Sequence, residues 1–365
     1  VRRLGAENCK RVTFLSTKDA NECMVKLGEQ TVRECIENAK EYPLEGVFSA
    51  SDLSNEIDDY YINGMPEGCD IQLPEFDELL KFHKGYMTCI TGIPNLGKTT
   101  FMDYLMCKLN VLHGWKFGVF SPESWPLQLH FSVIAEKLVG KTFNKKYPHR
   151  MSHEEMVEAK KYFDKNFFLI APPEDFTLDN ILATIRQLIR KQGISAFVID
   201  AWNTLDHKYS GDETKYISEQ LSKLSLFCQV NNVHFFLIAH PRKMGKVNGE
   251  WEVPNLYSIN GSAAFFNKFA NGICVHRDSN GVQIHIQKVK FKHWGKQGNV
   301  VLQWDWYSGR YYSFQKDESN WINVDRNNFQ QMQVEPTRLP QETLQRKLTA
   351  NDLAGFTNNE ITLEI

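Results

Sequence analysis

The sequence predicts an α/β protein in which helices flank a mainly parallel sheet and antiparallel strands extend one edge. Three observations predict this fold class. From residue 85 to residue 272, short apolar segments alternate with amphipathic segments of helical length, as in right-handed βαβ units. A glycine-containing loop separates the first apolar segment from the first helix. After Gly272 the pattern changes to short strands joined by Gly-containing turns, which indicates antiparallel pairing.

Composition sets only broad limits. A chain of 365 residues can form one large domain or two small ones, and a hydrophobic content of 42% is ample for a core. The net charge of -2 gives no global nucleic-acid signature, so any such binding must come from a local patch.

The cysteines and the first residues of the sequence indicate the cellular compartment of the protein. None of the eight cysteines forms a C-x-x-C pair, which argues against a zinc site and favours a reduced intracellular protein. No apolar stretch approaches ~18 residues, so we expect no membrane contact. The chain begins with Val1 without a signal peptide, so we expect a fragment of something longer. Its location would be the cytoplasm of a bacterium or a phage-infected cell, with an organelle as the alternative.

The first 84 residues precede the alternating pattern. Three elements are predicted before residue 41: a strand over 11–15 and helices over about 20–27 and 31–40. Pro and Gly punctuate residues 41–84, which we interpret as a linker with a short amphipathic helix starting at Ser51 or Asp52. The apolar face of that helix must dock on its own domain or on a neighbouring subunit.

The predicted elements of the main region follow in order. Strands that precede the change at Gly272 are predicted at 86–91, 116–121, 167–170, 195–199 and 234–239. Helices are predicted at 100–110, 124–139, 153–166, 178–192 and 213–231. The antiparallel strands are predicted at 273–276, 283–290, 300–306 and 310–314. Residues from about 316 are polar and rich in Gln and Asn, so we expect a flexible tail.

The loop between the first strand and the first helix fits the phosphate-binding pattern G-x-x-x-x-G-K-[ST] at every fixed position. Its glycines let backbone N–H groups point at phosphate oxygens, and the helix N-terminus adds partial positive charge. Lys98 would reach the β- and γ-phosphates, and the Thr99 hydroxyl would hold Mg²⁺. The residues expected to bind nucleotide here are Gly92, Asn95, Gly97, Lys98, Thr99 and Thr100. The alternative is a chance glycine turn before a core helix.

Two carboxylates follow strand ends in the same crevice. Asp200 ends an apolar strand, where it would orient Mg²⁺ through the water shell of the metal. Glu123 lies just past the tip of the second strand, where it could take a proton from the water that attacks the γ-phosphate. The alternatives are a helix cap for Asp200 and a first-turn helix glutamate for Glu123.

Cations follow the fifth strand. His240 ends that strand and could touch the γ-phosphate and report its loss to the next segment; a core histidine is the alternative. The Gly-containing loop after it carries three cations that suit a phosphodiester backbone: Arg242, Lys243 and Lys246. A solvated loop explains them equally well.

A row of lysines marks a later strand. Alternation predicts that Lys288, Lys290 and Lys292 share one strand face, where their charges repel each other unless an anion lies opposite. The anion could be a nucleotide phosphate from a neighbouring subunit. The alternative is a solvated edge strand that lysines protect from pairing.

Together these motifs resemble the Twinkle-type and DnaB-type replicative helicases, a hexameric branch of the RecA-like ATPases. The resemblance covers about residues 51–314 and rests on seven motifs: Gly92–Thr99, Ser121–Glu123, Val198–Asp200, Ile238–His240, Asn260–Ala263, Val275–Asp278 and Lys288–Phe291. Lys18–Glu22 also resembles the end of a Toprim primase domain, although on spacing alone it is a solvated helix start. The acidic residues of a Toprim centre would lie upstream, so we expect no primase activity.

The resemblance implies a division of the chain and roles for its residues. Four regions are implied: a Toprim-like remnant (1–45), a linker with a subunit-docking helix (46–84), a RecA-like helicase ATPase domain (85–315) and a polar flexible tail (316–365). Glu123 would be the catalytic base and His240 the γ-phosphate sensor. Arg277 and Trp304 would pack the nucleotide base, and Lys288 and Lys290 would project into the neighbouring site. The family usually has an arginine finger at the position of Lys290, and lysine lacks its planar fork.

The leading hypothesis is an enzyme that hydrolyses ATP, or another NTP or dNTP, with Mg²⁺. It would move 5′→3′ on single-stranded DNA as a hexameric ring and work with replication proteins such as primase or polymerase. The alternative is a RecA- or KaiC-like DNA-binding or regulatory ATPase that does not unwind DNA. A small-molecule P-loop kinase is disfavoured because no lid or second substrate pocket is visible in the sequence.

Overall fold

The structure is a computed structural model that describes residues 8–14, 17–41, 46–172, 175–207, 211–242, 244–247, 250–259, 263–278 and 281–323. The described residues divide into two compact units, one up to Pro66 and the other from Glu67 onward. Among the described helices, none combines the length and the apolar character that a bilayer crossing requires.

In the first unit, β1 (Lys10–Arg11) pairs antiparallel with β2 (Lys40–Glu41), and α1 (Ala20–Glu37) lies between them in sequence. The two predicted helices are both present within α1, which breaks at Gly28 with a φ of 86°. That left-handed value is one that glycine adopts without strain. The predicted strand over 11–15 is wrong in extent, because β1 ends at Arg11 and residue 15 lies outside the described residues.

The short amphipathic helix predicted in the linker is present. A 3₁₀ turn, η2 (Ala50–Leu53), leads into α2 (Ser54–Asn63). Within this unit, Ile57 and Tyr61 of α2 are 47% and 90% exposed, and no residue of α2 is buried. Ile57, Tyr61 and Ile62 are therefore exposed, and Tyr60 is only partly covered by the described residues.

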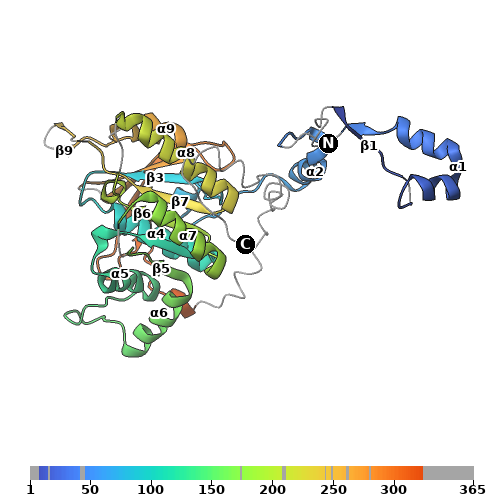
Figure 1. The fold of residues 1–365 in the computed structure, drawn as a ribbon. Helices are drawn as coiled ribbons and strands as arrows, with labels where there is room; N and C mark the ends of the chain where they lie inside the picture. Colours follow the sequence, from blue (N-terminus) through green and yellow to red (C-terminus); the bar gives the residue numbers. More distant parts are fainter. Residues whose placement is uncertain are drawn as a thin grey trace. The chain divides into compact units, whose positions relative to one another are not determined.

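The second unit is built on a nine-stranded sheet in the order β13-β12-β11-β10-β3-β7-β6-β4-β5. Figure 1 labels four of these strands, β3, β5, β6 and β7, among the helices of the unit. The strands from β10 to β5 in that order are parallel, and β11, β12 and β13 add antiparallel at one edge. The strands are β3 (Met87–Thr91), β4 (Phe117–Phe120), β5 (Phe167–Leu169), β6 (Ala196–Asp200), β7 (His234–Ile238), β10 (Asn271–Asp278), β11 (Gly281–Val289), β12 (Gly298–Trp304) and β13 (Tyr311–Tyr312). The predicted fold class is therefore confirmed.

Helices cover both faces of this sheet. The helices are α3 (Pro74–Asp77), α4 (Lys98–His113), α5 (Leu127–Val139), α6 (His153–Asn166), α7 (Leu178–Gln192), α8 (Glu213–Asn231) and α9 (Ala263–Lys268). Successive side chains of β7 pack on opposite faces of the sheet. Phe236 belongs to the hydrophobic cluster that includes α4, α5 and α6, and Phe235 belongs to the cluster that includes α7, α8 and α9. This alternation is what a strand buried on both faces produces.

Several predicted boundaries are wrong. The packed unit extends past residue 316, where the sequence predicts a flexible tail, because Trp321 of η6 (Trp321–Asn323) is buried in its core. The second predicted helix ends at Glu37 rather than residue 40, because Lys40 belongs to β2.

Two further boundaries are wrong for local reasons. The helix predicted from residue 124 begins at Leu127, because the ring of Pro126 keeps the preceding residue, Trp125, extended (ψ 142°) after a 3₁₀ turn, η3 (Pro122–Ser124). Residues 67–84, which lie in the predicted linker, contribute Ile71, Phe76 and Phe82 to the core of the second unit.

The predicted lysine strand is also wrong in extent. β11 ends at Val289, so Lys290 and Lys292 lie beyond it and do not share a strand face with Lys288. The chain turns there because aromatic rings pack together. The ring centroids of Phe291 and Trp294 are 4.5 Å apart, and those of Trp294 and Tyr86 are 4.6 Å apart.

Candidate functional site

The phosphate loop lies where several parallel strands end. Ile90 of β3 is paired with Ile238 of β7, and Asp200 at the end of β6 is paired with the same residue. The segments that follow these strands therefore leave the sheet at one edge, which is where open α/β sheets bind ligands.

The loop has the conformation that its glycines allow. Asn95 and Gly97 have φ values of 65° and 97°, and α4 begins immediately afterwards at Lys98, with Thr99 and Thr100 in its first turn. A Cβ atom on Gly92 would stand 2.2 Å from the carbonyl oxygen of Val275, so only glycine fits beside β10. The free N–H groups at the start of α4 suit phosphate oxygens.

The Lys98 ammonium is buried over its own loop. Its Nζ donates a 3.2 Å hydrogen bond to the carbonyl oxygen of Ile93. Burial lowers the pKa of Lys98, and the nearby carboxylates of Asp200 and Glu123 oppose that shift. A phosphate oxygen could replace the carbonyl as the partner of this charge.

Three oxygen-bearing side chains meet at Asp200. The hydroxyls of Thr99 and Ser121 donate to Asp200 Oδ2 at 2.8 and 3.2 Å. Asp200 Oδ1 is buried and has no hydrogen-bond partner in the described part of the chain. Burial raises the pKa of Asp200 to about 6. A hydroxyl and a carboxylate with an unused oxygen fit Mg²⁺, which prefers oxygen ligands.

Glu123 and His240 lie in contact. Glu123 belongs to η3 and His240 follows β7, and Oε1 of the first lies 3.2 Å from Nε2 of the second. The Glu123 side chain is partly exposed, as a group that meets a water molecule must be. The other ring nitrogen of His240, Nδ1, is buried without a partner among the described residues.

Sequence reasoning missed two features that support this site. The first is the contact of Ser121 with Asp200. The second is a buried pair, Asp103 Oδ1 and His130 Nε2 at 3.0 Å, which joins α4 to α5 just behind the site. Burial opposes the charge of His130, but Asp103 outweighs it and raises the pKa of the ring. Asp103 follows Lys98 by five positions on one helix, which is the only signal the sequence carries for this pair.

Arg277 and Trp304, to which the resemblance assigns the nucleotide base, lie beside each other. The Arg277 guanidinium carbon lies 5.4 Å from the centroid of the Trp304 ring. Trp304 is paired with Tyr311, whose hydroxyl would lie 3.4 Å from a Cβ on Gly97. The pair is therefore close to the phosphate loop. Trp304 Nε1 is buried with no partner in the described residues, so a ligand could accept its hydrogen bond.

Lys288 and Lys290 lie at the other end of the sheet. Lys290 Nζ lies 6.0 Å from the centroid of Tyr86, the residue before β3, whereas the phosphate loop follows β3. Lys288 is paired with Gly272 near the start of β10 and donates to the carbonyl oxygen of Phe266. Neither lysine can reach the phosphates of its own loop across the length of β3.

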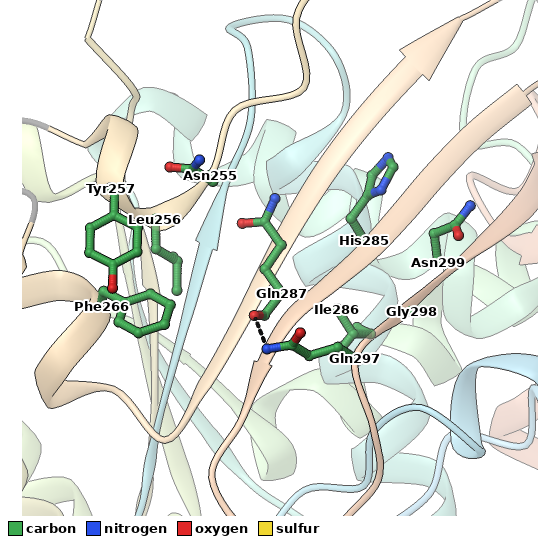
Figure 2. A pocket seen from close by; sticks show the side chains of 10 residues that line it. All are labelled: Asn255, Leu256, Tyr257, Phe266, His285, Ile286, Gln287, Gln297, Gly298 and Asn299. Atoms are coloured by element: carbon green, nitrogen blue, oxygen red, sulfur yellow. Dashed lines mark hydrogen bonds between the residues drawn. The ribbon is translucent and has the colours of Figure 1, made fainter.

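A groove of about 380 Å³ is lined in part by Phe266, whose carbonyl oxygen accepts from Lys288 (Figure 2). Aromatic and amide side chains line it, among them Tyr257, Phe266, Gln287, Gln297 and Asn299. The Tyr257 and Phe266 rings are stacked with centroids 4.3 Å apart, and Gln297 Nε2 donates to the carbonyl oxygen of Gln287. The groove is separate from the phosphate loop.

The basic loop after His240 is described in part. Arg242 N donates to Ser258 O at 2.7 Å, and Lys246 begins a two-stranded hairpin of β8 (Lys246–Val247) and β9 (Glu250–Trp251). Lys243 lies outside the described residues, as do residues 260–262 of the predicted Asn260–Ala263 motif.

Comparison with known proteins identifies a family whose sequences resemble this chain. Residues 68–239 match the DnaB-like helicase C-terminal domain. The chain is 37% identical over 333 residues to the Twinkle homolog protein, chloroplastic/mitochondrial, of Arabidopsis thaliana, covering 85% of the chain and 46% of that protein. It is 23% identical over 306 residues to the DNA helicase/primase of Enterobacteria phage T3, covering 77% and 52%. The chain thus spans about half the length of the curated relatives it matches.

Solved structures show the same fold. A solved ATPase domain superposes with a TM-score of 0.62 at 16% identity, covering 74% of this chain and all of that one. A DnaB-like replicative helicase superposes with a TM-score of 0.58 at 15% identity, covering 81% and 74%. The second unit therefore has the RecA-like fold of DnaB ATPase domains.

Proposed function

The chain belongs to the DnaB-like helicases, and from this premise we propose that it is the motor part of a replicative DNA helicase. It hydrolyses ATP, or another NTP or dNTP, with Mg²⁺. The hydrolysis drives 5′→3′ movement of a hexameric ring along single-stranded DNA. The curated relatives are about twice as long, so this proposal concerns only the part of the protein that the chain contains.

The 3.2 Å contact between Glu123 and His240 carries this proposal. Glu123 is suited to accept the proton of the attacking water, and His240 is followed directly by the loop with Arg242 and Lys246. Loss of the γ-phosphate would change what this pair contacts. The change would then pass along two residues of backbone to the cations that grip a DNA strand.

The described residues support a division of labour during hydrolysis. Lys98 exchanges the Ile93 carbonyl for the β- and γ-phosphates, as its 3.2 Å contact with that carbonyl allows. Thr99 and Asp200 would hold Mg²⁺, which neutralises phosphate charge when it is bound. Glu123 orients the water and takes its proton. Arg277 and Trp304 hold the base.

The position of Lys290 supports assembly of several copies. Because Lys290 and Lys288 lie at the far end of the sheet from their own loop, their charges are available to the nucleotide of a neighbour. Such an arrangement is head-to-tail, and head-to-tail contacts form a ring when the rotation between neighbouring subunits closes. The uncovered apolar side chains of α2 support a second contact, in which α2 docks on the adjacent subunit.

Partners and compartment follow from the same proposal. The ring works beside a primase or a polymerase, and residues 1–45 are the remnant of a Toprim-like domain. All eight cysteines are free, which fits a reduced compartment such as a bacterial or phage-infected cytoplasm or an organelle.

Two assays test the function. ATP hydrolysis is measured with and without single-stranded oligonucleotides, and strand displacement is measured on a fork with a free 5′ tail. We expect DNA to stimulate hydrolysis and the fork to open, with Glu123→Gln inactive in both assays. Stimulation without displacement would favour a RecA-like ATPase, and hydrolysis indifferent to DNA would contradict the proposal.

A further inference from the structure

The β8–β9 hairpin carries an aromatic ring beside a cation. Lys246 and Trp251 are paired across the hairpin, and Lys246 Nζ lies 4.7 Å from the centroid of the Trp251 ring. Trp251 as a whole residue is 41% exposed. One face of the ring is thus next to an ammonium group, while much of the ring remains open to solvent.

The base of the hairpin is anchored to the second unit. Pro241 forms an antiparallel bridge with Ile259, and Arg242 N donates to Ser258 O at 2.7 Å. Within the hairpin, Glu252 N donates to Gly245 O at 3.4 Å. Figure 1 shows β9 at the margin of the unit, beyond the strands of the central sheet. The ring of Trp251 is therefore presented on a held segment, where it can be approached from solvent.

We propose that Trp251 is a stacking platform for a nucleobase of single-stranded DNA and that Lys246 contacts the adjacent phosphate. The inference rests on the proposed function and deepens it, because cations alone bind only the backbone. Every base has a π-face, so an exposed indole binds bases without regard to sequence. The Lys246 ammonium beside the Trp251 ring places a positive charge where the phosphate of a nucleotide stacked on that ring would lie.

The experiment compares an oligo-dT strand with an abasic strand of equal length, which keeps the phosphates and lacks the bases. Binding of the full chain is measured by fluorescence anisotropy with a non-hydrolysable ATP analogue. The variants are Trp251→Ala, Trp251→Phe and Lys246→Ala, and Phe314→Ala serves as the control because Phe314 is another exposed aromatic, 88% accessible. Melting curves verify that each variant is folded.

We expect the wild type and Phe314→Ala to bind the abasic strand roughly 5- to 100-fold more weakly than oligo-dT. Trp251→Ala should bind both strands equally, at the abasic level, and Trp251→Phe should recover part of the preference. Lys246→Ala should bind both strands more weakly and show a shallower dependence on salt, because one phosphate contact is lost.

The inference is overturned if Trp251→Ala prefers oligo-dT as strongly as the wild type does, while DNA binding itself persists. It is also overturned if Trp251→Ala lowers the mass of the assembly, since the ring would then be a contact between subunits. Wild-type protein that binds neither strand would instead overturn the proposed function and the inference together.

Discussion

The Thr99 hydroxyl donates a 2.8 Å hydrogen bond to Asp200 Oδ2 and joins two elements that are 101 residues apart in sequence. It connects the first turn of α4 to the tip of β6, so the two oxygen groups suited to Mg²⁺ are already side by side. Asp200 is nevertheless buried with one oxygen unpartnered within the described residues. An uncompensated charge there costs stability until a cation arrives.

The first prediction concerns that cost. Burial raises the pKa of Asp200 to about 6 from an ordinary value near 4, so the folded state binds this proton more tightly than the unfolded state. Stability therefore falls as pH rises from about 4 to about 6 and stays lower above. Without nucleotide or metal at pH 7.5, Asp200→Asn should therefore have a higher melting temperature than the wild type. The increase should be roughly 2–4 °C for each ~1 kcal/mol by which removal of the buried charge stabilises the folded state.

Differential scanning fluorimetry at pH 7.5 and pH 4 measures this effect, and the gain should vanish at the lower pH. A lower melting temperature for Asp200→Asn at pH 7.5 would show that the two hydroxyl contacts outweigh the charge. Turnover should be lost in this variant in either case.

The second prediction separates chemistry from binding. Glu123→Gln keeps the shape of the side chain and removes the base, so turnover should fall at least ~100-fold while nucleotide affinity stays close to that of the wild type. Lys98→Ala removes a buried charge facing the phosphates and should weaken binding itself. Steady-state hydrolysis and equilibrium binding of a fluorescent analogue measure the two effects. Unchanged turnover in Glu123→Gln would remove Glu123 from its role.

The third prediction uses the separation of Lys290 from its own phosphate loop. Lys290→Ala and Lys98→Ala should each lack turnover, but a mixture should regain part of it. At equal mixing about a quarter of head-to-tail interfaces pair an intact loop with an intact Lys290. Hydrolysis by the mixture after subunit exchange is the measurement. A mixture as inactive as its parts would argue against a role of Lys290 in the neighbouring site.

The fourth prediction concerns a link at the end of α4 that lies away from the phosphate loop, between His113 and the segment before α3. His113 Nε2 lies 3.4 Å from Asp70 Oδ1. Burial opposes the charge of His113, but hydrogen bonds to Asp70 and Cys69 outweigh it and raise its pKa to about 10. The stabilisation is therefore complete below about pH 6.5 and is lost as pH rises toward 10.

Urea unfolding of the wild type and His113→Gln at pH 6, 7.5 and 9 tests this link. The difference in the free energy of unfolding should shrink steadily with rising pH. Asp70→Asn should show the same trend, because it removes the other partner of the pair. A difference that does not change with pH would mean that folding does not raise the pKa of His113.

Local sequence was sufficient for some elements and insufficient for others. The bounds of α7 and α8 match their predictions, because a clear apolar stripe and Gly193 define the first and Asp212 caps the second. The phosphate loop is equally local. By contrast, β11 ends early because Phe291 and Trp294 pack against Tyr86, about 200 residues earlier in the chain. No window of sequence shows that contact.

The site divides in the same way. The strand pattern predicted that Asp200 and His240 lie at the common edge of the parallel strands. Asp200 ends β6, and His240 comes two residues after the end of β7. The contact between Ser121 and Asp200 and the pair of Asp103 with His130 depend on how helices lie across the sheet, which periodicity does not specify. Residues of these types at those positions are compatible with many other partners.

The close approach of Gly92 to the Val275 carbonyl has a consequence for nucleotide choice. It sets the spacing between the cradle of the triphosphate and the tip of β10, which carries Arg277, through main-chain atoms alone. If Arg277 and Trp304 hold the base as proposed, substitutions at these two residues would change which nucleotide binds without moving the glycine loop. The preference for one nucleotide would then change separately from the contacts that the loop makes with phosphates.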